Sequence, residues 1–369
     1  KENVCGNPSP VIDRKTGRVI LVMTWNNGKD PEKKIHAKTS IDTRRVYVTY
    51  SDDEGKTWAE PREITSEAKR PEWQWYATGP CHSIQIRKGP HKGRIVVPCD
   101  HSNYGEGNFS HVIYSDDCGK TWAIGGIVKY GNESTITELS NGDLMLNMRC
   151  GDPATVRGED KPYRLVAISH DGGESFDEMY LDKGLEEPVC NASIINYNPA
   201  GQKTGKVLFS NPEHKNKRRN LTLRLSRNHG QKWERVYTVT EGPTAYSDIM
   251  VFDDGDVGVL YESGLKMSYE YISYQRVPAK VFHPEAEETV LLYPEGQKAG
   301  KGVTVNGVQV TEGPKVCNEI ERPEEVNQHG NVSYISDSAR VEIYIPHNPN
   351  GQMVIVCPGG GYSTVCAVK

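Results

Sequence analysis

The chain has 369 residues, with 44 Lys and Arg against 49 Asp and Glu, and a formal net charge of −5. This near balance gives no indication of a nucleic-acid or other polyanionic partner. No apolar run is long enough to span a membrane. The length favours two domains, or one large all-β unit with an appendage.

The cysteines do not form a recognisable pattern. There are nine, an odd number, and no CxxC pair or Cys/His ligand spacing is present. Neither a disulfide framework nor a zinc site is indicated. We expect most of them to be buried thiols that pack as small apolar residues.

Short runs of β-branched and aromatic residues, separated by turn residues, follow one another up to about residue 280. Residues 11–13 and 19–23 predict a first pair of strands, and the polar residues 26–40 predict a surface loop. Helical periodicity is not found before about residue 280, so the predicted fold class is all-β.

One eight-residue motif recurs along this region. It reads SDDEGKTW at residues 51–58 and SDDCGKTW at 115–122, with looser copies SHDGGESF at 169–176 and SRNHGQKW at 226–233. Each copy follows a predicted strand. A turn that recurs at intervals of several tens of residues is typical of a radial β-repeat architecture.

The motif has a structural explanation. The Asp side chain caps backbone N–H groups, Gly supplies the positive φ that closes the turn, and the Trp or Phe begins the next strand and packs into the sheet. We therefore interpret the motif as a hairpin corner without a chemical role.

The composition changes after residue 282. Residues 283–324 are rich in Pro, Gly and charge and are predicted to form a linker with a short β element at 303–310. Two strands are predicted at 339–345 and 353–357, and the second runs into PGGGY at 358–362. The predicted domains are 1–282, the linker 283–324, and a second domain over 325–369.

Several further motifs occur in a fixed order, and together with the repeats they resemble the exo-sialidase (neuraminidase) family. The resemblance covers the first 280 or so residues and implies a six-bladed β-propeller. The motifs are NPSPV at 7–11, TGPCH at 78–82, NEST at 132–135, LNMR at 146–149, RRNL at 218–221, AYSD at 245–248 and LYE at 260–262.

A sialoside has a carboxylate on its anomeric carbon, and arginine binds a carboxylate bidentately without losing its charge. The resemblance places Arg149 and Arg218 in the family's cluster of three arginines, with Arg219 as the alternative to Arg218 if the register shifts by one. It identifies Glu262 as the acidic residue that orients the first arginine of the cluster.

The resemblance also implies that Tyr246 is the nucleophile and that Glu133 takes its proton. A neutral phenol avoids the repulsion that a carboxylate nucleophile would meet at an anionic centre, and sialidases with a tyrosine nucleophile are known exceptions to the two-carboxylate scheme. A phenol with a pKa near ten needs such a base. Each residue alone has an ordinary structural explanation, and only the pattern favours the catalytic one.

Two histidines, His82 and His101, lie in segments near the predicted pocket. Neither has a partner that would suggest a triad or a metal site. We expect a structural role, or a place at the rim of the substrate site.

Relatives have an Arg-Ile-Pro strand and a general-acid aspartate, and both are expected upstream of Lys1. We therefore predict that this chain is a fragment of a complete sialidase and has little activity alone. The strand followed by PGGGY resembles the oxyanion-hole loop of α/β-hydrolase esterases. This favours a sialidase fused to the start of a sialate O-acetylesterase-like domain.

The leading hypothesis is an exo-α-sialidase that releases terminal sialic acid from glycoproteins, glycolipids or oligosaccharides with retention of configuration. No metal or organic cofactor is implied, and the family resemblance implies a secreted, periplasmic or cell-surface bacterial enzyme. A non-catalytic sialic-acid-binding lectin is the alternative, and a mainly esterase function is a third reading. Replacing Tyr246 with Phe separates enzyme from lectin, because only the enzyme loses a function.

Overall fold

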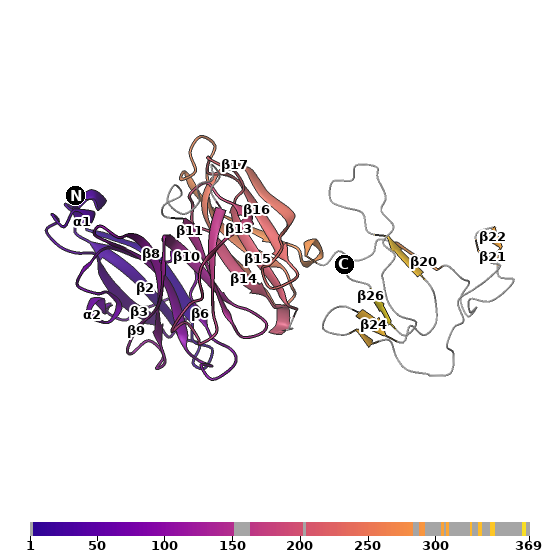
Figure 1. The fold of residues 1–369 in the computed structure, drawn as a ribbon, viewed down its shortest axis with the longest axis horizontal. Helices are drawn as coiled ribbons and strands as arrows, with labels where there is room; N and C mark the ends of the chain where they lie inside the picture. The colour runs from indigo at the N-terminus through magenta and orange to yellow at the C-terminus, as the bar shows by residue number, and fades with distance from the viewer. Residues whose placement is uncertain are drawn as a thin grey trace. The chain divides into compact units, whose positions relative to one another are not determined.

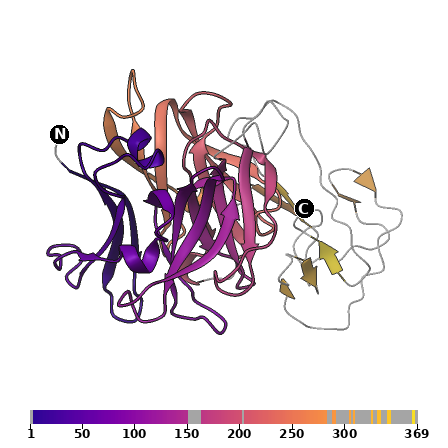
Figure 2. The ribbon, with the colours of Figure 1, turned by 60° about the vertical axis from the view of Figure 1, so that its left-hand side comes forward.

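The computed structural model describes residues 3–150, 163–201 and 204–282, and beyond them only short strands. The chain divides into two compact units, Lys1–Phe282 and His283–Lys369. The first unit contains the four sheets that carry the site, and they follow one another from the indigo to the orange part of the chain (Figures 1 and 2).

All four sheets are antiparallel between neighbouring strands, as expected for segments joined by short turns. The first contains β1 (Val4–Ile12), β2 (Val19–Asn26), β3 (Arg45–Ser51) and β4 (Arg62–Glu63). The second contains β5 (Trp73–Thr78), β6 (Ile84–Gln85), β7 (Ile95–Asn103), β8 (Gly107–Ser115) and β9 (Ala123–Lys129).

The third sheet contains β10 (Gly131–Glu138), β11 (Leu144–Cys150), β12 (Tyr163–Ser169) and β13 (Tyr180–Glu186). The fourth contains β14 (Ser193–Tyr197), β15 (Lys206–Pro212), β16 (Arg219–Ser226), β17 (Glu234–Val251), β18 (Val257–Ser263) and β19 (Tyr271–Val277). Helical segments are short: α1 (Glu32–His36), α2 (Thr65–Ala68), and the 3₁₀ turns η1 (Pro199–Gly201) and η2 (Ala279–Val281).

The all-β prediction is confirmed for the first unit and the arrangement is propeller-like, but the expected count of six blades is wrong for its described residues, which form four sheets. One part of the difference comes from β17, which has 18 residues. Its first part pairs with β16 and its last part with β18. Two groups of strands are thereby joined into one six-stranded sheet.

The core lies between successive sheets. In β2 buried residues alternate with partly exposed ones, the period expected for a strand with one face toward a core. Ile20 and Val22 of β2 pack with Ile95 and Val97 of β7 in one cluster between the first and second sheets. Further clusters lie between the second and third sheets and between the third and fourth.

The repeated motif forms the same turn four times. In each copy the Gly N–H donates to the first Ser Oγ at 2.8 Å. Asp53 Oδ1 accepts the backbone N–H of Thr57 at 2.8 Å, and Asn228 Oδ1 accepts that of Lys232 at 2.9 Å. The amide in the fourth copy therefore replaces the carboxylate without loss of the cap. Packing of the aromatic residue differs, because Trp58 is 44% exposed whereas Trp122 is buried.

The segment at residues 26–40 is not simply a loop, as predicted, because it contains the helix α1. Pro31 precedes the helix, where its fixed φ is compatible with helix initiation. Ile35 is buried and anchors this short helix.

Six cysteines of the described part are not joined in disulfides, and of these Cys81, Cys99, Cys150 and Cys190 are buried. No helix among the described residues is long and apolar enough to cross a membrane.

In the second unit only strand backbone is described: β20 (Glu288–Leu291), β21 (Thr304–Val305), β22 (Val308–Gln309), β23 (Glu325–Val326), β24 (Asn331–Ser333), β25 (Arg340–Ile343) and β26 (Thr364–Cys366). The strands β21 and β22 form a small hairpin inside the predicted element at 303–310, and β25 falls inside the strand predicted at 339–345. The strand predicted at 353–357 and the PGGGY segment lie outside the described residues. The α/β-hydrolase prediction for this unit therefore has no structural support.

Candidate functional site

A tyrosine and a glutamate from different sheets meet in the first unit. The Tyr246 hydroxyl, on β17, lies 2.7 Å from both Oε1 and Oε2 of Glu133, on β10. Glu133 is 9% exposed and Tyr246 is half-buried. Burial of the phenol, and then the negative charge of Glu133, raise the pKa of Tyr246 above its usual range. The resting pair is therefore a neutral phenol that donates a hydrogen bond to a carboxyl group.

Arg149, on β11, forms an ion pair with the same carboxylate: its Nη1 lies 2.7 Å from Glu133 Oε2. Burial of the guanidinium opposes its charge, but Glu133 and Tyr246 outweigh this and raise the pKa of Arg149. Its Nε is buried and has no hydrogen-bond partner among the described residues. This cation thus retains an unused donor beside the tyrosine.

Arg218 lies on the other side of the tyrosine, and its guanidinium carbon is 5.4 Å from the centre of the Tyr246 ring. It donates to the Tyr269 hydroxyl at 2.6 Å and to the Val189 carbonyl at 2.9 Å. Arg219, the alternative in the sequence, instead donates to the Glu241 carbonyl and is exposed. Arg218 is therefore the arginine that faces the tyrosine.

The side chain of Glu262, on β18, contacts the backbone of Tyr246. Its Oε2 accepts the Tyr246 N–H at 3.1 Å. The strand register explains why this N–H is free for a side chain. Thr244 pairs with Ser263 and Ser247 with Tyr261, so β17 carries one extra residue over Ala245–Tyr246. Such a bulge removes a residue from the ladder and redirects its side chain.

The same bulge occurs at the site in the third sheet. Gly131 pairs with Cys150 and Ser134 with Met148, which leaves Asn132 and Glu133 opposite the single residue Arg149. Glu133 and Tyr246 therefore occupy the same position of two equivalent hairpins, and Arg149 and Glu262 occupy the position opposite them. Both pairs are separated by 16 residues in the sequence.

Two other sheets repeat this irregularity. In the second sheet the register shifts between Trp73 and Tyr76, which puts Trp75 in the bulge and Ser102 opposite. Ser102 Oγ accepts the Trp75 N–H at 3.1 Å, as Glu262 does for Tyr246. In the first sheet the shift falls between Gly6 and Ser9, so Pro8 takes the equivalent position. The strand β14 pairs without a shift.

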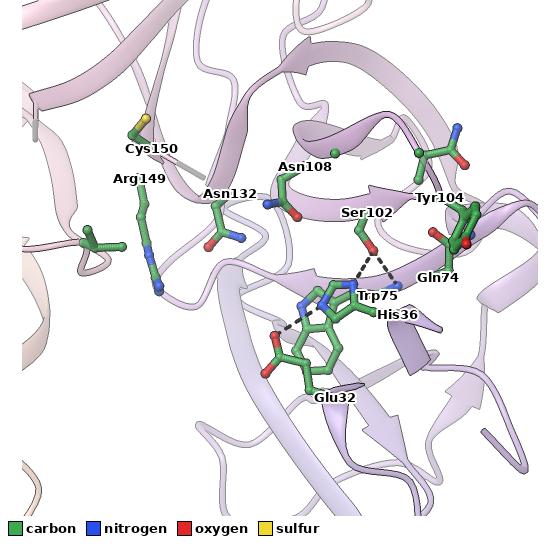
Figure 3. Close-up of a pocket in the computed structure, with 14 residues that line it drawn as sticks. Glu32, His36, Gln74, Trp75, Ser102, Tyr104, Asn108, Asn132, Arg149 and Cys150 are labelled. Carbon is green, nitrogen blue, oxygen red and sulfur yellow. Dashed lines mark hydrogen bonds and ion pairs between the residues drawn. The ribbon is translucent and has the colours of Figure 1, made fainter. Parts of the chain in front are cut away.

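A cavity of about 450 Å³ is lined in part by Arg149, the arginine that pairs with Glu133 (Figure 3). Trp75 is stacked on His36 with ring centres 5.7 Å apart, and the guanidinium of Arg44 lies 4.1 Å from the Trp75 ring centre. The lining is mostly polar and consists of Glu32, His36, Gln74, Trp75, Ser102, Asn103, Tyr104, Gly105, Gly107, Asn108, Asn132, Arg149, Cys150 and Val189.

Sequence reasoning missed the lining residues His36, Trp75 and Ser102. The helix α1 that carries His36 lies in a segment predicted as a loop. The bulge that directs Trp75 leaves no mark in the alternation of apolar residues. The repeated spacing of 16 between site residues was a usable signal for equivalent hairpins.

A fully buried ion pair holds the backbone segments next to Arg149 and around Val189. Arg164 Nη1 lies 2.8 Å from Glu187 Oε2, and neither side chain is exposed. Arg164 also donates to the Cys190 carbonyl at 2.8 Å, and Glu187 Oε1 accepts the Cys150 N–H at 3.0 Å. These bonds hold the residue after Arg149 and the segment near Val189, whose carbonyl binds Arg218.

The two histidines considered from sequence have different surroundings. His101 is buried and stacks on Trp73 with ring centres 3.5 Å apart, as a structural residue would. His82 does have a charged partner, because its Nδ1 lies 2.6 Å from Asp248 Oδ1.

The arrangement contains a neutral oxygen that can become a nucleophile, a carboxyl group within hydrogen-bond distance to take its proton, and two fixed cations. Such a set suits attack on a centre that bears a carboxylate.

The sequence matches the model of the BNR repeat-like domain over residues 1–259. Among curated proteins, it is 34% identical over 281 residues to a sialidase of Micromonospora viridifaciens, covering 71% of this chain and 41% of the relative. It is 31% identical over 290 residues to a sialidase of Bacteroides fragilis, covering 76% of this chain and 50% of that protein. The chain thus spans half or less of the length of these two relatives.

Solved structures agree with the sequence matches. Hadza microbial sialidase Hz136 superposes with a TM-score of 0.64 at 29% identity, covering 76% of this chain and 53% of that one. The intramolecular trans-sialidase from Ruminococcus gnavus superposes with a TM-score of 0.58 at 19% identity, covering 76% and 79%, and shows the likeness of fold. The family match over most of the first unit, together with these relatives, leads to one conclusion: the chain belongs to the sialidase family that contains the BNR repeat-like domain.

Proposed function

We propose that the first unit is the catalytic domain of an exo-α-sialidase that hydrolyses terminal sialic acid from glycoproteins, glycolipids or oligosaccharides. The observation that carries this proposal is the hydrogen bond between the Tyr246 phenol and the Glu133 carboxylate, with Arg149 on the same carboxylate. The names of the relatives support the substrate class.

Substrate binding uses the two arginines. Arg149 lies beside Glu133, the carboxylate that accepts the Tyr246 hydroxyl, and Arg218 lies over the face of the Tyr246 ring. The substrate carboxylate would therefore lie next to the phenol. Both guanidinium groups stay charged at any physiological pH. Among the described residues Arg149 bonds to Glu133 through Nη1, and its other guanidinium donors would bind the incoming carboxylate.

The first chemical step is attack of the Tyr246 oxygen on the anomeric carbon while Glu133 takes the phenol proton. The bond to the leaving oxygen breaks, and a general acid protonates that oxygen, a role that the family resemblance gives to an aspartate. Water then attacks the anomeric carbon and gives a proton to the same carboxylate, the glycosyl–tyrosine bond breaks, and Glu133 returns a proton to the phenolate. Two displacements at one carbon retain its configuration.

The raised pKa of Tyr246 is consistent with this scheme. A free phenolate would be repelled by Glu133 and by the substrate carboxylate. Proton transfer during the attack avoids that state, and a positioned base commonly contributes ~10²–10⁴-fold in rate.

Glu262 holds the bulge that carries the nucleophile, through the Tyr246 N–H. The family role of orienting the first arginine is proposed in addition, and a single carboxylate with two oxygens is able to serve both. From the family resemblance we also propose that the enzyme is exported to the periplasm, the cell surface or the medium.

The test is hydrolysis of a fluorogenic sialoside by the chain and by a form extended N-terminally, each with Tyr246→Phe. Tyr274→Phe, at an exposed tyrosine of β19, is the matched control. We expect Tyr246→Phe to abolish turnover and the control to retain it. Sialoside binding without turnover in every form, unchanged by Tyr246→Phe, would establish the lectin alternative instead.

A further inference from the structure

Residues 79–83, here termed the central loop, contact strands of three other sheets. Toward β1, the Cys81 N–H donates to the Pro8 carbonyl at 3.3 Å and the Ser83 N–H to the Pro10 carbonyl at 2.8 Å. The backbone is tight, because Gly79 has a φ of +45° and a Cβ there would lie 2.6 Å from the Cys81 nitrogen. Only glycine adopts this conformation without strain.

The loop also contacts the strands that carry the site. The Gly79 carbonyl accepts the N–H of Ser134, the residue after Glu133, at 3.4 Å. At its other end, Cys81 Sγ donates to the Ser247 carbonyl, next to Tyr246, at 3.4 Å. Each contact is made one residue beyond a bulge.

A charged pair fastens the loop to β17. Asp248 Oδ2 accepts the His82 N–H at 3.0 Å, and Asp248 Oδ1 lies 2.6 Å from His82 Nδ1. Since a carboxylate only accepts, the ring proton lies on Nδ1. Asp248 Oδ1 also accepts from the Ser193 hydroxyl at 2.8 Å and from the Ile249 N–H at 3.0 Å. This carboxylate is thus held by four donors, two of which come from His82.

These contacts connect Glu133 and Tyr246 by a second route besides their own hydrogen bond. Ser134, the residue after Glu133, bonds to the central loop, and the loop bonds to Asp248, two residues after Tyr246. The Tyr246 hydroxyl in turn bonds to Glu133. The strand β14 also bonds to both strands, through Ser193 to Asp248 and through the Ile194 N–H to Thr135 Oγ1. The central loop reaches Ser134 and Ser247, the residues directly after the two bulges. A shift of His82 relative to Asp248 therefore changes the separation of the two catalytic groups.

We infer that His82 and Asp248 are positioning residues for the reaction: through the central loop they set the distance between the Tyr246 oxygen and the Glu133 carboxylate. Their effect on turnover rests on the proposed function, whereas their effect on the geometry does not. Neither residue touches the reacting atoms.

The experiment compares His82→Ala with His82→Asn. The Asn side chain places an amide N–H near the position of the imidazole Nδ1, so it retains the donor to Asp248 that Ala removes. His170→Ala is the matched control, because His170 is also paired with carboxylates, Asp143 and Asp177, but is exposed on the third sheet. Thermal unfolding establishes that each variant is folded.

We expect His82→Ala to lower kcat on a fluorogenic sialoside about 10- to 100-fold, the scale of a misplacement of about 1 Å, with KM within about twofold. His82→Asn recovers most of this loss, and His170→Ala changes neither constant. A second readout needs no turnover: the ring signal of Tyr246 in protein labelled with ζ-¹³C tyrosine, assigned with Tyr246→Phe. It moves in His82→Ala and stays in His170→Ala.

A folded His82→Ala variant with normal kcat and an unmoved Tyr246 signal would overturn the inference. If His82→Ala does not fold, Asp248→Asn serves the same purpose, because it keeps the size of the side chain and removes its charge; a folded Asp248→Asn with normal kcat and signal is equally contrary. Full turnover by Tyr246→Phe would defeat the proposed function alone, and the NMR comparison would still decide the positioning.

Discussion

The Tyr246 hydroxyl lies 2.7 Å from each carboxylate oxygen of Glu133, although the two residues are 113 positions apart in the sequence. The symmetric approach means that either oxygen can take the phenol proton. We propose this pair as the chemical centre of the first unit.

Replacing Glu133 with Gln tests its role as the base. We expect kcat to fall by ~10²–10⁴-fold, the usual contribution of a positioned base. The pKa of Tyr246 should fall as well, because removal of the negative charge makes the phenolate less unfavourable, while burial still keeps it raised. Steady-state kinetics and NMR titration of labelled tyrosine measure the two effects. Glu60→Gln, at an exposed residue, is the control, and unchanged kinetics in Glu133→Gln would exclude a base at this position.

Replacing arginines with lysine tests the carboxylate site. Loss of a bond to a charged group costs about 1.5–3 kcal/mol, so Arg149→Lys and Arg218→Lys should each raise KM about 10- to 100-fold. Arg219→Lys should leave KM within about twofold, because Arg219 is exposed and bonded to a backbone carbonyl. A larger effect from Arg219 than from Arg218 would contradict the register that the structure shows.

The buried pair of Arg164 and Glu187 is expected to dominate the stability of the third sheet. Glu187→Gln leaves a guanidinium without its counter-charge where neither side chain is exposed, which typically costs about 3–5 kcal/mol of the free energy of unfolding. Arg276→Met removes two ion pairs, to Asp254 and Asp256, in which the arginine side chain is 47% exposed, and should cost much less stability because solvent screens such pairs. Urea unfolding measures the free energy of unfolding of both variants. Equal losses would contradict the expectation that the buried pair contributes more than the exposed one.

The repeated turns should respond to acid according to their capping residue. Burial opposes the charge of Asp171, but bonds from the Ser175 hydroxyl and N–H outweigh it and lower the pKa of Asp171 to about 2. The unfolded value is near 3.9. Because the folded value is the lower one, Asp171 stabilises the fold above about pH 4, and this contribution is lost as the pH falls toward 2.

An Asp171→Asn variant should keep the cap, as Asn228 does, and should lose less stability than the unmodified chain between pH 4 and pH 2.5. Melting temperatures at pH 7, 4 and 2.5 check this. Parallel losses in the two proteins would show that this carboxylate does not contribute.

The sequence indicates the class of fold and the main site residues because both depend on local patterns. The repeated turn and the ordered motifs point to Tyr246, Glu133, Arg149, Arg218 and Glu262. The number of sheets was not predictable in this way, because β17 continues as one strand through Gly242-Pro243, a pair of residues that normally indicates a turn. The choice between Arg218 and Arg219 likewise depends on the register of β16, because Arg219 is the first residue that pairs with β17 and Arg218 precedes it.

The bulges were hidden for a related reason. An extra residue in a strand changes hydrogen bonding across to the partner strand, and the residue pattern along one strand does not record the partner's register. His82 illustrates the same limit, since its partner Asp248 lies 166 positions away. Contacts of this kind exist only once the sheets are assembled.

The recurring bulge has a consequence for how this scaffold can change. The second bulged residue is Pro8, Trp75, Glu133 or Tyr246, and none of them is paired in the strand register of its hairpin. The scaffold therefore separates the residues that hold a hairpin together from the one residue that it presents. New chemistry can be introduced by exchanging the presented residue, and we expect the hairpin beneath it to keep its strand pairing.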